Sequence, residues 1–179
     1  MSDAPDEVMW AGKYLAAKRC GPWEYATRQG DGRAAVLLAI DDEDHVLLVD
    51  QYRVPLGRRS LELPAGLVGD DVADEGVEAA AARELEEETG YRASRLDIIG
   101  DFASSPGMTS ETFTLVRASG LTRVGDGGGV AGEGITVHRV PVSEVAAYVA
   151  ERRAEGFAID VRILVLLGTL VLPTTVRPE

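Results

Sequence analysis

The chain has 179 residues, of which 45% are hydrophobic and 27% are charged, a composition typical of a soluble globular protein of one domain. Its formal net charge of −12 argues against a nucleic-acid-binding surface, although metal ions and a few arginines would still let it bind a small phosphorylated molecule. The single cysteine, Cys20, excludes an internal disulfide and indicates a reducing compartment such as the cytoplasm.

The N-terminal part is expected to form strands after a short tail. Residues 1–9 are acidic and polar, which predicts a flexible tail without a secretory signal. The alternation of Trp23, Tyr25 and Thr27 then predicts a strand that follows a turn at Gly21-Pro22. Trp23 and Tyr25 would share one face of it, where sheet packing is the simpler interpretation.

Two apolar runs, 33–40 and 45–53, are separated by four acidic residues, which predicts a hairpin with a solvated turn. Glu62 stands between two leucines on a further predicted strand and is expected to face a pocket. Arg58 and Arg59 are expected to be exposed loop charges.

A helix is predicted from Val77 to Thr89, because the segment contains no proline or internal glycine and Gly90 follows as a C-cap. Glu84, Glu87 and Glu88 fall on one arc of this helix, where their charges repel. A solvated acidic face and a site for hard divalent cations both account for this cluster. Arg83 is placed to relieve only Glu87. Asp70, Asp71 and Asp74 precede the helix, where its dipole favours acids.

The remainder of the chain is expected to alternate strands with loops and to end in helices. Strands are predicted at 95–102, 112–117 and 135–140, and a glycine-rich loop at 125–134 is expected to be mobile. Two helices should close the chain, one from Glu144 to Arg153 capped by Ser143 and one from Val161 to Leu172 capped by Asp160. The apolar run 163–172 is too short to span a bilayer.

The spacing around the predicted helix resembles the Nudix box of hydrolases that cleave nucleoside diphosphates linked to another moiety. Its specified positions are Gly69, Glu75, Arg83, Glu84, Leu85, Glu87, Glu88, Gly90 and Tyr91. The resemblance implies that Glu84 and Glu88 bind catalytic Mg²⁺ or Mn²⁺, that Glu87 binds directly or through water, and that Arg83 orients a glutamate. Pro64-Ala65-Gly66 lies three residues further from the box than in relatives that hydrolyse ADP-ribose, so either the loop carries a three-residue insertion after Gly66 or Gly69 has taken over the turn. The resemblance implies the backbone carbonyl of Ala65 as a further metal ligand.

Segments outside the box are similar to ADP-ribose pyrophosphatases, and this similarity implies further roles. Arg33 and Arg53 would contact the diphosphate, and Trp23 the adenine. The loop 104–111 would close over the terminal ribose, with Glu111, Gly107 and Met108 at the substrate. Glu133 would be the general base, with Glu111 or the box glutamate Glu87 as alternatives.

The resemblance implies a single α/β (α+β) domain over residues 1–179, a Nudix-type alpha-beta-alpha sandwich with a mixed β-sheet. The expected reaction is metal-dependent hydrolysis of ADP-ribose to AMP and ribose 5-phosphate. The alternatives are a nucleotide sugar such as GDP-mannose, another nucleoside diphosphate derivative, or a non-catalytic ADP-ribose sensor. A homodimer is expected by resemblance alone, without nucleic-acid or membrane partners.

Overall fold

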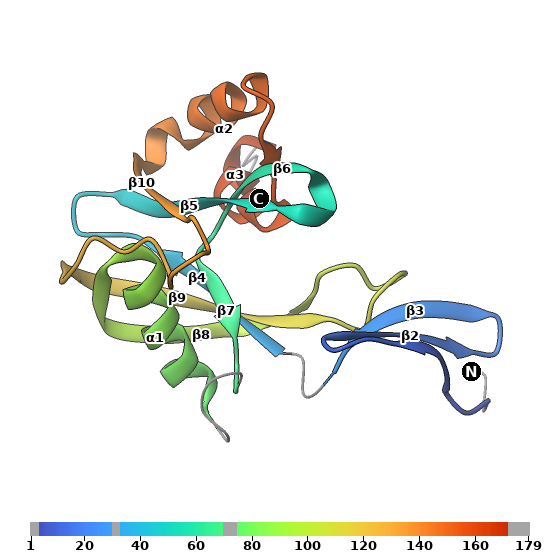
Figure 1. Ribbon diagram of the computed structural model, residues 1–179. Coiled ribbons are helices and arrows are strands. Elements are labelled where there is room, and N and C mark those ends of the chain that lie inside the picture. The colour runs from blue at the N-terminus through green and yellow to red at the C-terminus, as the bar shows by residue number, and fades with distance from the viewer. Residues whose placement is uncertain (1–3, 30–32, 70–74, 172–179) are drawn as a thin grey trace, which may run out of the picture.

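The computed structural model of the protein describes residues 4–29, 33–69 and 75–171, which form three sheets with helices around two of them (Figure 1). The N-terminal sheet has the order β1-β2-β3, made of Glu7–Ala11, Leu15–Cys20 and Trp23–Arg28. The second sheet has the order β7-β4-β9-β8, made of Ala65–Leu67, Arg33–Ala39, Thr112–Arg123 and Tyr91–Ala103. The third has the order β10-β5-β6-β11, made of Thr136–Pro141, His45–Arg53, Arg58–Glu62 and Ala158–Ile159.

The helices are α1 at Val77–Thr89, α2 at Val145–Ala154 and α3 at Leu164–Val171, with short 3₁₀ turns at Val54–Leu56, Val142–Glu144 and Val161–Ile163. Within these residues, none of the helices combines the length and apolar character needed to cross a bilayer. Asp160 caps the final helical segment as predicted, because its carboxylate accepts the amide N–H of Arg162. Ser143 does not cap α2, since it lies inside the preceding 3₁₀ turn.

Both four-stranded sheets are mixed, as the predicted fold requires. β4 pairs with β9 in parallel and β6 with β11 in parallel, whereas the other pairs are antiparallel. The predicted hairpin between 33–40 and 45–53 is wrong: β4 and β5 lie in different sheets, and the strand pairing between the two runs is limited to the bridge between Ile40 and Val46. Each strand instead has partners on both sides within its own sheet.

Two apolar cores lie on opposite sides of the central strands β4 and β5. Side chains that include Ala35, Leu37 and Leu47 pack with Ala80, Ala81 and Leu85 of α1. Their neighbours along the same strands, including Val36, Val46 and Leu48, pack with Val145 and Val149 of α2 and with Ile163. Because successive strand residues point to opposite faces, this alternation places helices on both sides of the central strands, in the predicted alpha-beta-alpha arrangement.

The structure corrects the expected tail and lengthens two strands. β1 begins at Glu7, so residues 7–9 are part of the N-terminal sheet instead of a flexible tail. β8 and β9 continue beyond their predicted ends and pair from Tyr91 opposite Arg123 to Ala103 opposite Thr112. The sequence pattern does not predict the full length of these strands, because polar residues and glycines interrupt the alternation of apolar residues. In the structure, pairing with the neighbouring strand stabilises these positions.

Candidate active site

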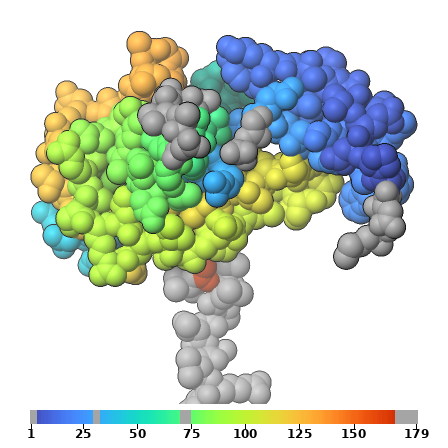
Figure 2. All heavy atoms as spheres, turned by 90° about the horizontal axis from the view of Figure 1, so that it is seen from below, coloured from blue at the N-terminus to red at the C-terminus, as the bar shows by residue number. Residues whose placement is uncertain are grey.

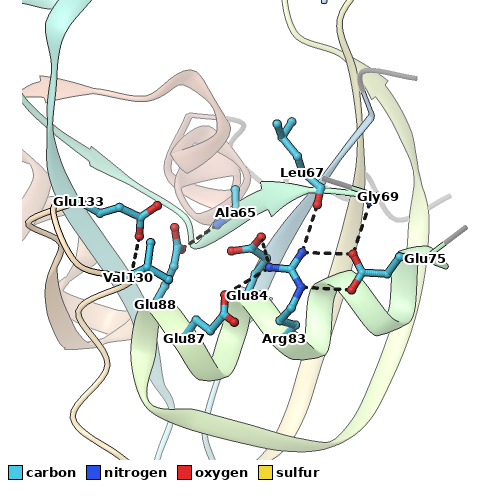
Figure 3. Close-up of polar contacts among 10 residues, drawn as sticks. All are labelled: Ala65, Leu67, Gly69, Glu75, Arg83, Glu84, Glu87, Glu88, Val130 and Glu133. Atoms are coloured by element: carbon cyan, nitrogen blue, oxygen red, sulfur yellow. Dashed lines mark hydrogen bonds and ion pairs between the residues drawn. The ribbon is translucent and has the colours of Figure 1, made fainter. Parts of the chain in front are cut away.

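Helix α1 carries the acidic cluster and has the predicted bounds, Val77–Thr89. It ends because Gly90 adopts a left-handed conformation with φ of 73°, which costs little for a glycine. Leu85 is fully buried against the strands, which turns Glu84, Glu87 and Glu88 toward a cavity next to β7 (Figure 3). Of the three, Glu88 is the most buried, with 5% of its surface exposed.

Arg83 is bonded to three carboxylates, not to one. Its Nε and Nη2 each lie 3.1 Å from an oxygen of Glu75, and its Nη1 lies 2.8 Å from Glu84 and 3.2 Å from Glu87. Nη2 also donates to the carbonyl of Leu67 at 3.3 Å (Figure 3). The contact with Glu75 raises the pKa of Arg83 and lowers that of Glu75. Arg83 therefore ties the segment before α1, β7 and the acidic face together. Asp70, Asp71 and Asp74 lie outside the described residues.

Glu88 is a carboxyl group whose surroundings disfavour its charge. Burial raises its pKa to about 8, and the neighbouring carboxylates of Glu84 and Glu133 act in the same direction. The amide N–H of Ala65, which donates to Glu88 Oε2 at 3.0 Å, and the more distant Arg53 oppose this rise. Burial also raises the pKa of Glu84. The site therefore disfavours the ionised forms of these two carboxyl groups unless a positive charge compensates them.

Gly66, which precedes the box, and Gly69, which begins it, have separate roles. A Cβ atom on Gly66 would lie 1.8 Å from the Cδ atom of Glu84, so a larger residue there would force the Glu84 side chain away from its present position beside β7. Gly69 has φ of 80° at the end of the described segment, and its amide lies 3.4 Å from Glu75 Oε2. The two functions therefore fall on glycines three residues apart: Gly66 allows β7 to lie close to Glu84, and Gly69 forms the turn.

The cavity, of about 670 Å³, gathers most of the predicted site residues. Those that line it are Arg53, Glu62, Ala65, Arg83, Glu84, Glu87, Glu88, Glu111 and Glu133. Four predicted substrate contacts, Trp23, Arg33, Gly107 and Met108, lie outside the lining, and Trp23 and Met108 are exposed. Sequence reasoning missed Arg28, Asp160 and Arg162, which also line it.

The part of the cavity lining that lies outside α1 contains ion pairs between arginine and acidic side chains. Arg53 donates to both oxygens of the buried Glu62, at 2.8 Å from Nε and 2.7 Å from Nη2. Arg162 approaches the same carboxylate at 3.6 Å and pairs with Asp160 at 2.6 Å. Glu62 thus holds an arginine at the wall of the cavity, and the 39% exposure of the Arg53 side chain leaves it accessible from the cavity.

Glu111 is held by a residue of the N-terminal sheet. Arg28 Nε donates to Glu111 Oε1 at 2.7 Å, and Ser104 Oγ donates to Glu111 Oε2 at 3.2 Å. Backbone hydrogen bonds from Ala26 to Met108 and from Ser110 to Ala26 join β3 to this loop. No local signal marks Arg28, because β3 brings together residues 83 positions apart.

The donor set fits a hard divalent cation. Glu84, Glu87 and Glu88 would supply oxygen ligands from one rigid face, and a cation would compensate the burial and the carboxylate repulsion that together raise the pKa of Glu88. In the described parts of the chain, no three His, Cys, Asp or Glu side chains already stand together as a metal site. One oxygen of each of these carboxylates accepts a hydrogen bond, from Arg83 in the case of Glu84 and Glu87 and from the amide of Ala65 in the case of Glu88.

Comparison with known proteins agrees with this geometry. The NUDIX domain family matches residues 31–158, a stretch that contains α1, its acidic face and Glu133. The chain belongs to the NUDIX domain family. A solved structure described as an ADP compounds hydrolase shares the fold, with a TM-score of 0.69 at 22% identity over 93% of this chain and 91% of that one. Nudix proteins generally use divalent metal ions, in keeping with the donor set above.

Two Nudix relatives differ in the substrate their names state. The ADP-ribose pyrophosphatase of Mycobacterium tuberculosis (strain ATCC 25618 / H37Rv) is 44% identical over 92 residues, which are 51% of this chain and 44% of that protein. The GDP-mannose pyrophosphatase of Cronobacter sakazakii (strain ATCC BAA-894) is 34% identical over 153 residues, which are 80% of this chain and 75% of that protein. The chain thus spans less than half the length of the mycobacterial relative.

Proposed function

We propose that this Nudix protein hydrolyses the pyrophosphate bond of ADP-ribose, giving AMP and ribose 5-phosphate. The observation that carries the proposal is the meeting of Glu84, Glu87 and Glu88 with Glu133 and Arg53 in one cavity. Mg²⁺ or Mn²⁺ on Glu84, Glu88, Glu87 and the Ala65 carbonyl would supply a water of lowered pKa and neutralise charge on the phosphates. The similarity to the mycobacterial ADP-ribose pyrophosphatase supports this choice of substrate.

The protein's own groups would do the rest of the chemistry. Glu133 accepts the proton of the attacking water, and Glu111 or Glu87 is the alternative base. Arg53 holds phosphate oxygens by exchanging part of its contact with Glu62, because a guanidinium can bind two oxygens at once. Arg83 keeps Glu84 and Glu87 on one side of the cavity through its contacts with both.

GDP-mannose is the second candidate substrate, because the relative named for that activity matches more of this chain than the mycobacterial one does. The acidic helix cannot distinguish the two, since it would contact only the diphosphate. Discrimination must come from the opposite wall of the cavity and from the loop that carries Glu111.

The test is phosphate release, in a coupled phosphatase assay, from ADP-ribose, GDP-mannose, NADH and diadenosine polyphosphates with Mg²⁺, Mn²⁺ or a chelator. We expect metal-dependent turnover of ADP-ribose well above the others, abolished in Glu88→Gln and lowered at least 100-fold in Glu133→Gln. Glu78→Gln, an exposed change on the same helix, is the matched control. A protein that turns over nothing but gains thermal stability from ADP-ribose would be a sensor instead.

We also propose that the protein acts as a homodimer in the cytoplasm. The N-terminal sheet supports an assembly, because large apolar side chains there are exposed: Val8, Met9, Trp10, Tyr14, Leu15 and Trp23. The free thiol of Cys20 on the same sheet is in keeping with a reducing compartment.

A further inference from the structure

The glycine-rich segment 125–134 is packed onto the C-terminal end of α1. The amide of Gly128 donates to the carbonyl of Glu88 at 2.8 Å, and the amide of Gly129 donates to the carbonyl of Glu87 at 3.0 Å. The last carbonyls of a helix have no partner within the helix, so these bonds satisfy groups that would otherwise need water. The segment that carries Glu133 is therefore attached to the residues whose side chains form the acidic face.

Glycine is required at two positions of this contact. Gly127 has φ of 68°, and a Cβ there would lie 2.4 Å from the backbone carbonyl carbon of Thr89 and 2.6 Å from the backbone carbonyl oxygen of Glu88. Gly129 has φ of 73°, and a Cβ there would lie 2.1 Å from Glu133 Oε2. The first clash is with backbone, which cannot rotate away. Gly127 thus lets the segment reach the helix, and Gly129 leaves room for the Glu133 carboxylate.

The carboxylate of Glu133 is itself oriented. Its Oε2 accepts the amide N–H of Val130 at 2.9 Å, and Figure 3 shows it beside the carboxylate of Glu88. Its charge contributes to the raised pKa values of Glu84 and Glu88, which places it within electrostatic reach of both. Glu133 therefore lies beside the acidic face of α1 in the lining of the cavity.

The other end of the segment is fixed by Arg59, which is a partly buried residue of β6 and not the exposed loop charge that the sequence predicts. Arg59 Nη2 donates to the carbonyl of Gly134 at 2.9 Å and to Thr136 Oγ1 at 3.0 Å. Its Nε forms a close ion pair with Asp50, which is buried and also lies 2.5 Å from His138 Nε2. Arg59, which is paired with Asp50 in the third sheet, thus fixes the backbone of Gly134, the residue next to Glu133.

We propose that Gly127, Gly129 and Arg59 are positioning residues that fix Glu133 opposite the box glutamates of α1. This inference rests on the proposed function, in which Glu133 takes a proton. None of the three needs to contact substrate. Their loss should therefore lower kcat with little change in KM, because proton transfer depends on the position of the base more steeply than substrate binding does.

Gly127→Ala and Gly125→Ala form a matched pair in the same loop. A Cβ on Gly125 would meet nothing closer than 3.9 Å, so Gly125→Ala should retain kcat within about twofold. Gly127→Ala should lower kcat at least tenfold. Arg59→Ala should do likewise, and Arg59→Lys should recover part of the loss, because lysine keeps the charge but not the forked donors.

A double-mutant cycle separates positioning from general damage. In a Glu133→Gln background, Gly127→Ala should cause no further loss of kcat, since the group it positions is already gone. If the loss of kcat in the double variant equals the product of the losses in the two single variants, the inference is overturned, whereas the proposed hydrolysis is unaffected. Full activity of Glu133→Gln alone would instead remove the proposed role of Glu133, and the inference with it.

Amide hydrogen exchange provides a readout that does not depend on turnover. In the protein without metal or substrate, peptides covering 125–134 should exchange at least tenfold faster in Gly127→Ala than in the native protein or in Gly125→Ala. Peptides from the first turns of α1 should be unchanged. Equal exchange in all three proteins would show that the loop is not held by these contacts and would overturn the inference.

Discussion

At the scale of single residues, Glu88 combines a structural cost with a proposed chemical role. Its carboxyl is 5% exposed and its pKa is raised to about 8 by burial, with Glu84 and Glu133 adding to the rise. In the absence of metal, much of this group should carry a proton at neutral pH. A divalent cation would have to displace that proton, so apparent metal affinity should increase as the pH rises toward 8.

Glu88→Gln tests this cost through stability. Because the folded protein binds the proton of Glu88 more tightly than the unfolded chain does, its contribution to stability is complete below the ordinary pKa of 4.5 and is lost as the pH rises through about 8. Glutamine does not ionise. In a chelator, the free energy of unfolding of Glu88→Gln relative to the native protein should therefore rise by a few kcal/mol between pH 5 and pH 9, since each pKa unit corresponds to about 1.4 kcal/mol.

Denaturant unfolding at several pH values measures this difference, with Glu78→Gln as the exposed control on the same helix. The control should stay within about 0.5 kcal/mol of the native protein at every pH. A pH-independent difference between Glu88→Gln and the native protein would mean that the Glu88 carboxyl ionises normally despite its burial.

At the scale of elements, the close approach of β7 to α1 shapes the acidic face. Gly66→Ala would push a methyl group against the carboxylate of Glu84, 1.8 Å from its Cδ, and Glu84 would have to turn away. We expect the metal concentration for half-maximal activity to rise at least tenfold. Destabilisation should stay at about 1–3 kcal/mol, as for other overpacking changes.

The prediction is tested by measuring the activity of Gly66→Ala as a function of metal concentration and by measuring its thermal unfolding. Gly168→Ala in α3 is the control, because a Cβ there meets nothing within 4 Å and Gly168 does not line the cavity. If Gly66→Ala keeps the native metal dependence, Glu84 does not need its present position to bind metal.

Local chemistry explains which elements the sequence could predict. α1 has its predicted bounds because helix propensity and the Gly90 cap are properties of neighbouring residues. β4 and β5 were also located, but not their partners, since pairing depends on residues far along the chain. The same limit applies to the site. The box glutamates follow from spacing, whereas Arg28 and Arg162 line the cavity only because the fold brings them there.

At the scale of the whole molecule, the N-terminal sheet stands apart from the rest. β1, β2 and β3 extend away from the body formed by the two four-stranded sheets (Figure 1), and in Figure 2 this blue region forms its own lobe. It touches the body through the loop that carries Glu111, including the bridge between Ala26 and Thr109. A sheet in this position can present a face to a second copy while one of its ends reaches the cavity.

Trp10 and Trp23 test whether the lobe forms the proposed dimer, because each is 61% exposed in the single chain. Buried tryptophans are among the strongest contributors to interfaces, at about 2 kcal/mol or more each. Trp10→Gln or Trp23→Gln should therefore raise the dissociation constant of the dimer at least tenfold in sedimentation equilibrium, with little change in thermal stability. Ile98→Gln, at a residue 50% exposed on β8, should leave it unchanged. A native protein that sediments as a monomer at all concentrations, or equal weakening by Ile98→Gln, would place the dimer contact elsewhere or remove it.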